Sequence, residues 1–170
     1  LGGNAALWHG ALVGLSAQTG TGFTTLDPAL LGPAALVVLV AAMLIGGSIG
    51  STTGGVKLLR VVILFRLLQW SLQRSTAAAH AVVEPRLGGR PLESDDLIRV
   101  LLLFTLFGLV VLLSWLAFLV AGYPPLPALF EVASATGTVG LTTGITRPGL
   151  EPLLKAVLCF DMLAGRLEVV

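Results

Sequence analysis

An apolar stretch from residue 97 to residue 121, which carries no charge after Arg99, constrains the fold more than any other feature of the sequence. A helix needs roughly 20 consecutive apolar residues to cross the hydrocarbon core of a bilayer, and this stretch is long enough. Only 11% of the residues are charged, whereas a soluble domain carries about a quarter. The sequence therefore predicts an integral membrane protein.

Two further apolar stretches, 32–70 and 150–170, are each interrupted, the first by glycines and the second by charged residues that include Lys155, Asp161 and Arg166. Each follows a shorter apolar segment, 5–17 or 126–135. At about a dozen residues these shorter segments cannot span a bilayer, and they are typical of helices that enter the membrane and turn back. The pattern predicts an all-α membrane protein.

The basic residues indicate which side of the membrane each loop faces. Seven of the ten Lys and Arg residues lie between residues 57 and 99, around a polar loop at 71–96. Because positive charge gathers on the cytoplasmic side, we expect this loop to be cytoplasmic. The loops at 26–33 and 143–149 carry a single basic residue and should lie outside. A net charge of +1 gives no reason to expect a nucleic-acid partner.

The sequence contains an internal repeat. Residues 16–25 match 134–143 at five of ten positions, with an offset of 118 residues (140 − 22). Residues 43–46 match 162–165 at three of four positions, with an offset of 119. Two matches in the same order indicate a duplicated unit of short helix, Gly/Thr loop and long helix. Because the connecting loop is expected inside and both Gly/Thr loops outside, the two units should be parallel.

The first Gly/Thr loop (residues 20–25) and the second Gly/Thr loop (residues 138–143) carry the chemistry. A cation that leaves water must be recoordinated by oxygens, which an extended chain with its carbonyls facing one axis supplies. Glycine permits the required dihedral angles, and the C-terminal end of a preceding short helix favours a cation. The K+ ligands of the expected selectivity filter are Gly20, Thr21, Gly22, Phe23, Thr138, Val139, Gly140 and Leu141.

Segments 21–25, 46–57 and 137–146 together resemble the C-terminal half of the Trk/Ktr/HKT superfamily of potassium transporters. Members of that superfamily have four helix–pore-loop–helix repeats in one chain. The resemblance implies that Gly22 and Gly140 are filter glycines, one in each repeat. Thr142 stands where a potassium channel has a second glycine, which leaves the preference for potassium over sodium open.

The expected fold is therefore an all-α membrane protein of helix–pore-loop–helix repeats, with re-entrant pore helices and one broken transmembrane helix. Residues 1–75 would form the third pore-loop repeat without its first helix. Residues 76–96 would form a cytoplasmic linker, and residues 97–170 the fourth repeat with a truncated last helix.

A glycine-rich segment (residues 46–55) interrupts the first long helix. Each Gly costs a helix roughly 1 kcal/mol relative to Ala, so the helix should break here. About 13 residues separate the break from Pro33, which places it inside the membrane, facing a polar cavity. It is either a hinge or helix-packing surface or a mobile gate, and the resemblance supports the gate. The expected gate residues are Gly46, Gly47, Ser48, Gly50, Ser51, Thr52, Thr53, Gly54 and Gly55.

Arg166 aligns within one residue of Gly47 in the repeat and should lie at a similar depth. A buried guanidinium is costly and usually marks a pathway or an ion pair. We interpret Arg166 as part of the gate, an electrostatic barrier in the pore. The superfamily that the sequence resembles has an arginine at this position of its last helix. The alternatives are a pair with Asp161 or Glu168, or snorkelling to the inner interface. Glu131, in the second short helix, could raise the local cation concentration, but we favour a structural role in hydrogen bonding.

The predicted function is potassium uptake across the cell membrane through this filter and gate. A sodium-permeable or weakly selective cation transporter, the potassium-binding subunit of a pump, and a non-transporting membrane scaffold are the alternatives. An enzyme is not expected, because the sequence has neither a nucleophilic triad nor a phosphate-binding loop. No cofactor is expected beyond the transported ion.

The resemblance also implies a setting and partners. The protein would be a multi-pass protein of the cell inner membrane, surrounded by lipid. It would work as a homodimer with a cytosolic nucleotide-binding regulatory subunit, for which the basic loop at 71–96 is a candidate contact. Both ends of the chain lie in apolar sequence, so we expect a longer protein.

Overall fold

The computed structural model describes residues 3–47, 51, 53–76, 86–87, 90–91 and 94–166. The described chain is mainly helical, as expected. Its helices are α1 (Gly3–Thr19), the 3₁₀ helix η1 (Pro28–Leu30), α2 (Pro33–Leu44), α3 (Leu58–Thr76), α4 (Ser94–Val120), α5 (Pro125–Thr136) and α6 (Pro152–Arg166). The expected gate residues Ser48, Gly50 and Thr52, and most of the linker at 76–96, lie outside the described residues.

Proline and glycine set the ends of the helices that surround the Gly/Thr loops. Helices α2, α5 and α6 each begin with a proline, whose missing N–H and fixed φ suit the first helical position. Helix α1 ends where Gly20 takes a left-handed φ of +68°, a conformation that commonly terminates helices. The short segments of the sequence therefore become short helices with sharp ends.

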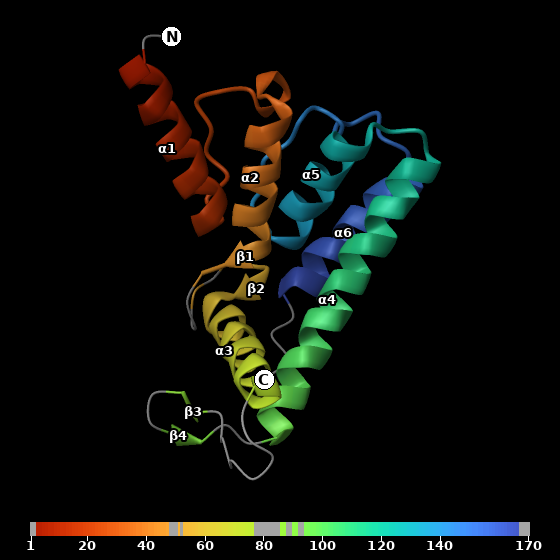
Figure 1. Cartoon of the computed structure of the whole chain (residues 1–170). Coiled ribbons are helices and arrows are strands. Elements are labelled where there is room, and N and C mark those ends of the chain that lie inside the picture. The colour runs from red at the N-terminus through yellow and green to blue at the C-terminus, as the bar shows by residue number, and fades with distance from the viewer. Residues whose placement is uncertain are drawn as a thin grey trace.

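Helix α4 passes both α6 and α3 (Figure 1) and contains a candidate membrane span, Ile98–Val120, with a mean hydropathy of 2.6, which lies within the predicted stretch 97–121. Among the described helices, it alone is long and apolar enough to cross a membrane by length and composition. Only 11% of the most apolar window in this span is buried. Its large exposed leucines are suited to lipid or to a neighbouring protein surface.

Helix α5 lies at the centre of the packing, because all its residues from 130 to 136 are buried. One side joins a cluster with α1 and α2 that includes Val13, Leu39 and Phe130. The other side joins a cluster with α4 and α6 that includes Phe118 and Leu154. The two short apolar helices of the sequence, α1 and α5, are thus linked through α2 (Figure 1).

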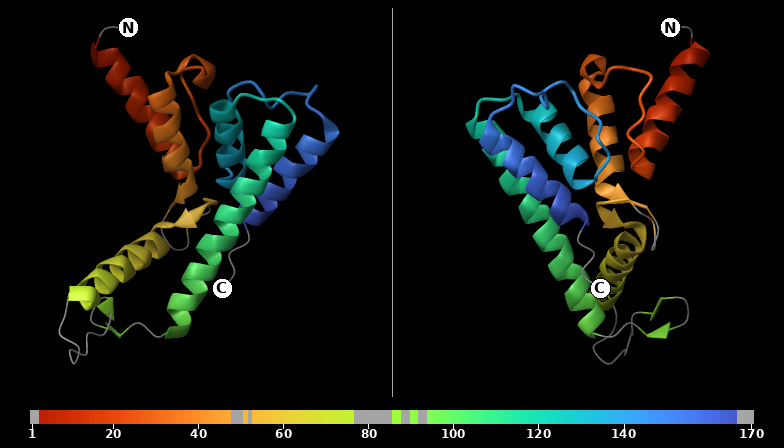
Figure 2. Two further views of the ribbon diagram at one scale, coloured as in Figure 1. Left: turned by 45° about the vertical axis from the view of Figure 1, so that its right-hand side comes forward. Right: turned by 180° about the vertical axis from the view of Figure 1, so that it is seen from behind.

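The first long apolar stretch is broken, as the glycines predicted. Helix α2 ends at Leu44, and α3 begins at Leu58 and leaves at a different angle (Figure 2). Between them, strand β1 (Ile45–Gly46) pairs in parallel with strand β2 (Val56–Lys57), so that the two ends of the glycine-rich segment lie side by side.

The polar segment between the two halves is shorter than the sequence predicted. Helix α3 continues to Thr76 and α4 begins at Ser94, because Leu, Gln and Arg near the end of α3 are good helix formers. Strands β3 (Arg86–Leu87) and β4 (Arg90–Pro91) form an antiparallel pair within this segment.

Candidate cation pathway

The two Gly/Thr loops share one backbone pattern. In the first loop, Gly20 and Gly22 have positive φ angles of +68° and +73°. At the equivalent positions of the second loop, Thr138 and Gly140 have φ angles of +53° and +88°. Thr138 is the only residue other than glycine with a positive φ in the described part of the chain. A chain whose φ alternates in sign can turn successive carbonyls toward one side, as a row of cation ligands requires.

Each loop leaves its helix through the same hydrogen bond. The Thr21 backbone N–H donates to the Ser16 carbonyl at 3.1 Å, and the Val139 N–H donates to the Ser134 carbonyl at 2.9 Å. These donors and acceptors are 118 residues apart in the sequence, which is the offset of the internal repeat. The sequence repeat is therefore also a repeat of local geometry.

The two loops lie against each other. A Cβ atom added to Gly22 would overlap the carbonyl oxygen of Val139, so the Gly22 backbone touches the second loop directly. Only glycine permits this approach together with a positive φ. The structure thus brings together the two glycine positions that the sequence singled out, although they lie far apart along the chain.

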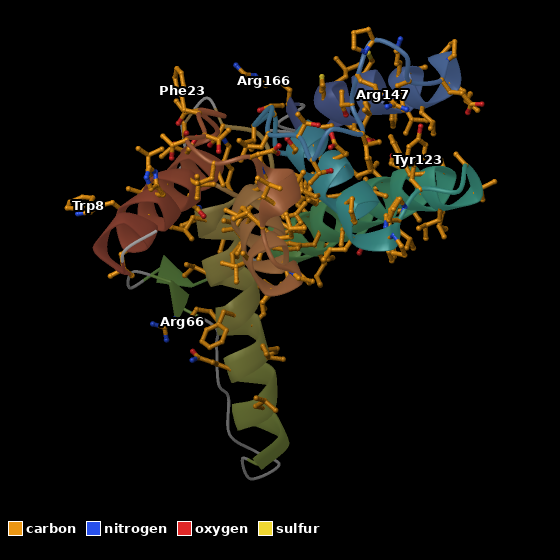
Figure 3. The ribbon with its side chains drawn as sticks, turned by 90° about the horizontal axis from the view of Figure 1, so that it is seen from above. Trp8, Phe23, Arg66, Tyr123, Arg147 and Arg166 are labelled. Carbon is orange, nitrogen blue, oxygen red and sulfur yellow. The ribbon has the colours of Figure 1, made fainter. Side chains whose placement is uncertain are left out.

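Side chains of the second loop alternate between core and open space. Val139 and Leu141 are buried in the cluster with α1 and α2, whereas Gly140 between them is exposed. A cavity of about 380 Å³ borders this loop on the side of α6. In the first loop, Phe23 is 74% exposed, and its ring points away from the helices (Figure 3).

The glycine-rich segment, which lies between α2 and α3, contacts both Gly/Thr loops. The Gly54 N–H donates to the Thr138 hydroxyl at 3.1 Å. A Cβ atom added to Gly20 would lie 2.9 Å from the Thr53 methyl group. Since Gly20 and Thr138 are equivalent in the repeat, residues 53 and 54 contact the same point of each loop.

Lys57 holds the glycine-rich segment in place. Its Nζ donates to the Ser51 carbonyl at 2.6 Å and to the Thr53 carbonyl at 3.0 Å, and the residue is only 4% exposed. The Thr53 hydroxyl also accepts a bond of 2.8 Å from the Gly47 N–H. The sequence predicted a cytoplasmic positive charge at Lys57 and placed it in the resembling segment 46–57, but it did not predict these bonds.

Glu131 holds the far end of the second loop. It is buried in α5, and its Oε1 accepts bonds from the Thr142 hydroxyl at 2.7 Å and from the Thr143 N–H and hydroxyl at 2.7 and 2.9 Å. Its Oε2 accepts a bond of 2.5 Å from the Thr146 hydroxyl. The hydrogen-bonding role that the sequence favoured for Glu131 agrees with these contacts.

The C-terminal end of α6 reaches the C-terminal end of α5. A Cβ atom on Gly165 would overlap the Thr136 carbonyl oxygen, so α6 crosses very close to the last turn of α5. The next residue, Arg166, is exposed, and its side chain points off the same edge of the molecule as Phe23 in the view from above (Figure 3).

Asp161, which the sequence offered as a partner for Arg166, pairs elsewhere. Its Oδ1 accepts a bond of 2.6 Å from the Ser114 hydroxyl of α4. Within the described chain, its Oδ2 has no hydrogen-bond partner. The other suggested partner, Glu168, lies outside the described residues.

The known proteins that this chain is similar to are cation transport proteins. The family model described as "TrkH: Cation transport protein" matches residues 4–170. An uncharacterized cation transporter of Methanocaldococcus jannaschii is 31% identical over 156 residues, which cover 92% of this chain and 33% of the relative. The Trk system potassium uptake protein TrkH of Escherichia coli strain K12 is 34% identical over 159 residues, which cover 91% and 32%.

Two further similarities are informative. The potassium/sodium uptake protein NtpJ of Enterococcus hirae is 31% identical over 153 residues, covering 87% of this chain and 32% of NtpJ. The crystal structure of the potassium transporter TrkH from Vibrio parahaemolyticus superposes with a TM-score of 0.78 at 25% identity, covering 96% of this chain and 41% of that one. This chain spans about a third of the length of the curated relatives that it matches.

Proposed function

Because the chain belongs to the TrkH family of cation transport proteins, we propose that it supplies two of the pore loops of a potassium uptake protein. The family match and the likeness to the TrkH crystal structure confirm the resemblance found in the sequence. They also confirm a helical membrane protein of a transport family, which is not an enzyme family.

The contact of Gly22 with the Val139 carbonyl carries the proposal for the filter. K+ would bind to main-chain oxygens of residues 20–23 and 138–141, which share one φ pattern and lie side by side. An ion stripped of water needs several oxygens at once, and two adjoining loops supply more of them than either does alone. The remaining ligands would come from the other repeats of the full-length protein.

The glycine-rich segment, Lys57 and Arg166 would form the gate beneath this filter. Residues 53 and 54 contact the equivalent point of each Gly/Thr loop, so a shift of this segment changes the inner end of both. Lys57 would hold the segment closed through the Ser51 and Thr53 carbonyls. Arg166 would add a positive charge that opposes the passage of cations.

A sodium-permeable transporter is the second candidate, supported by the similarity to a potassium/sodium uptake protein. Thr142, which replaces the second glycine of a potassium-channel filter, turns its hydroxyl to Glu131. Its side chain is therefore engaged with the pore helix, which leaves main-chain oxygens as the ligands. A shorter row of such ligands discriminates less strictly between ions.

We also propose the wider arrangement that the family suggests. Residues 1–75 and 97–170 would be the third and fourth pore-loop repeats, joined by a linker at 76–96. The protein would lie in the cell inner membrane with residues 71–96 in the cytoplasm, and work as a homodimer with a cytosolic nucleotide-binding regulatory subunit. The positive charge between residues 57 and 99 supports this orientation.

Radioactive rubidium uptake by the full-length protein, in cells that lack their own potassium uptake systems, tests the proposal. We expect rubidium uptake that excess potassium suppresses strongly and excess sodium suppresses weakly. Equal suppression by both ions would support the weakly selective alternative. No uptake above that of cells with an empty vector, at verified membrane expression, would instead support a scaffold.

A further inference from the structure

The helices that precede the two Gly/Thr loops differ in one buried residue. Behind the second loop, Glu131 is 3% exposed in the pore helix α5. At the offset of the internal repeat, the equivalent residue of α1 is Val13, which is also 3% exposed but apolar. The same position in two otherwise similar units therefore holds an acid in one and a hydrocarbon side chain in the other.

The environment of Glu131 suits a carboxylate. Four donors point at its two oxygens, and one of them, the Thr143 N–H, can only donate. A buried charge is tolerated when its hydrogen-bonding capacity is satisfied, and charge-assisted bonds are stronger than neutral ones. Glu131 thus places a fixed negative charge next to the second loop, where low polarity makes its field stronger than in water.

The first loop is held in a different way. The Thr24 hydroxyl donates to the Leu26 carbonyl within the loop itself. The Thr25 hydroxyl lies 2.8 Å from Nδ1 of His9, near the start of α1. In the described residues neither of these contacts involves an acidic side chain, so the first loop lacks the buried carboxylate and the four-bond anchor of the second.

We propose that Glu131 is a positioning residue that determines ion specificity and makes the two loops unequal. Its charge would raise the affinity of the second loop for a dehydrated cation. Its four bonds would fix the spacing of the carbonyls around Gly140, since they anchor the chain from Thr142 to Thr146. This inference rests on the proposed function and assigns the ion preference chiefly to the fourth repeat.

Charge and anchoring can be separated by substitution in the full-length protein. Glu131→Gln removes the charge and keeps the side-chain length. Thr146→Val keeps the charge and removes one of the four donors. Glu151→Gln is the matched control, because it also neutralises an acid but lies in an exposed position just before α6. Rubidium uptake is measured against rubidium concentration, with and without competing sodium.

We expect Glu131→Gln to weaken the apparent rubidium affinity about three- to tenfold, equivalent to about 0.6–1.4 kcal/mol. We expect Thr146→Val to keep that affinity within about twofold but to lower the preference for rubidium over sodium. Glu151→Gln should behave as the wild type. A merely structural Glu131 would instead lower the amount of folded protein and the maximal rate, with affinity and ion preference unchanged.

The proposal is overturned if Glu131→Gln keeps the wild-type affinity and ion preference. If that variant does not reach the membrane, Glu131→Asp and Thr146→Val decide, and an unchanged ion preference in both would overturn the proposal. Failure of the proposed function is distinguishable, because the wild-type protein itself would then show no rubidium uptake.

Discussion

The Gly54 backbone N–H donates a hydrogen bond of 3.1 Å to the hydroxyl of Thr138. This bond ties the broken helix to the one residue other than glycine that adopts a positive φ in the described chain. A β-branched residue keeps such a conformation only where its surroundings hold it there. The bond therefore couples the shape of the second Gly/Thr loop to the position of the glycine-rich segment.

Replacing Lys57 with Met should increase the flux of ions. The substitution keeps the length of the side chain and removes both bonds to the Ser51 and Thr53 carbonyls. Hydrogen bonds from a charged donor are worth about 1.5–3 kcal/mol each, so the segment should loosen. We expect the maximal rate of rubidium uptake to rise about twofold or more.

Lys155→Met is the control for that experiment, because Lys155, which is exposed on α6, also donates to a backbone carbonyl, that of Pro148 in the preceding loop. Its uptake should match the wild type. An unchanged rate in Lys57→Met would show that the lysine supports the fold without restraining a gate.

Replacing Gly22 with Ala should separate the two Gly/Thr loops. The added methyl group would overlap the Val139 carbonyl, and the positive φ costs a residue with a Cβ about 1–2 kcal/mol. We expect rubidium uptake to fall sharply and sodium uptake to fall less. Gly32→Ala is the control, because Gly32 has an ordinary φ of −64° and open space around it. Wild-type ion preference in Gly22→Ala would mean that this contact lies outside the filter.

Replacing Arg166 with Ala should raise rubidium uptake, whereas Arg166→Lys should stay close to the wild type. The expectation follows from charge, because a fixed cation near the path of an ion raises the barrier to its passage. Both variants are compared by initial rates at equal membrane expression. Equal rates in the alanine variant and the wild type would favour a role for Arg166 in pairing or interface anchoring.

Replacing Ser114 with Ala should destabilise the packing of α4 against α6. Asp161 would lose the Ser114 hydroxyl as its donor and keep a buried, unsatisfied carboxyl group, which costs about 1–3 kcal/mol. The double substitution Ser114→Ala with Asp161→Leu should recover stability, because it removes both polar partners. Thermal unfolding of the purified protein in detergent measures both effects, and a double variant less stable than Ser114→Ala would contradict this explanation.

The sequence predicted the repeat, the short helices and the helix break because each has a local cause. Glycine runs break helices wherever they occur, and an apolar stretch as long as 97–121 forms a span without help from its neighbours. The equivalence of Gly22 and Gly140 was also visible, since both positions need the conformation that glycine alone adopts freely.

The contacts that organise the site were less accessible from the sequence. The hydrogen bonds that Lys57 donates depend on the conformation of the glycine-rich segment. The four bonds that Glu131 accepts depend on the path of the chain after residue 141. Asp161 pairs with Ser114, which lies 47 residues away along the chain. The pair of Asp161 and Ser114 arises from packing of distant segments, and no spacing in one sequence encodes it.

The central claim is that the two Gly/Thr loops form one cation filter, and the most direct test is the ratio of rubidium to sodium uptake in Gly140→Ala and Gly149→Ala. A Cβ atom has open space at both positions, but only Gly140 has a positive φ, +88°. Gly140→Ala should lower the ratio about tenfold, since its backbone strain of about 1–2 kcal/mol would distort the carbonyls. Gly149→Ala should keep the wild-type ratio. A wild-type ratio in Gly140→Ala as well would contradict the account.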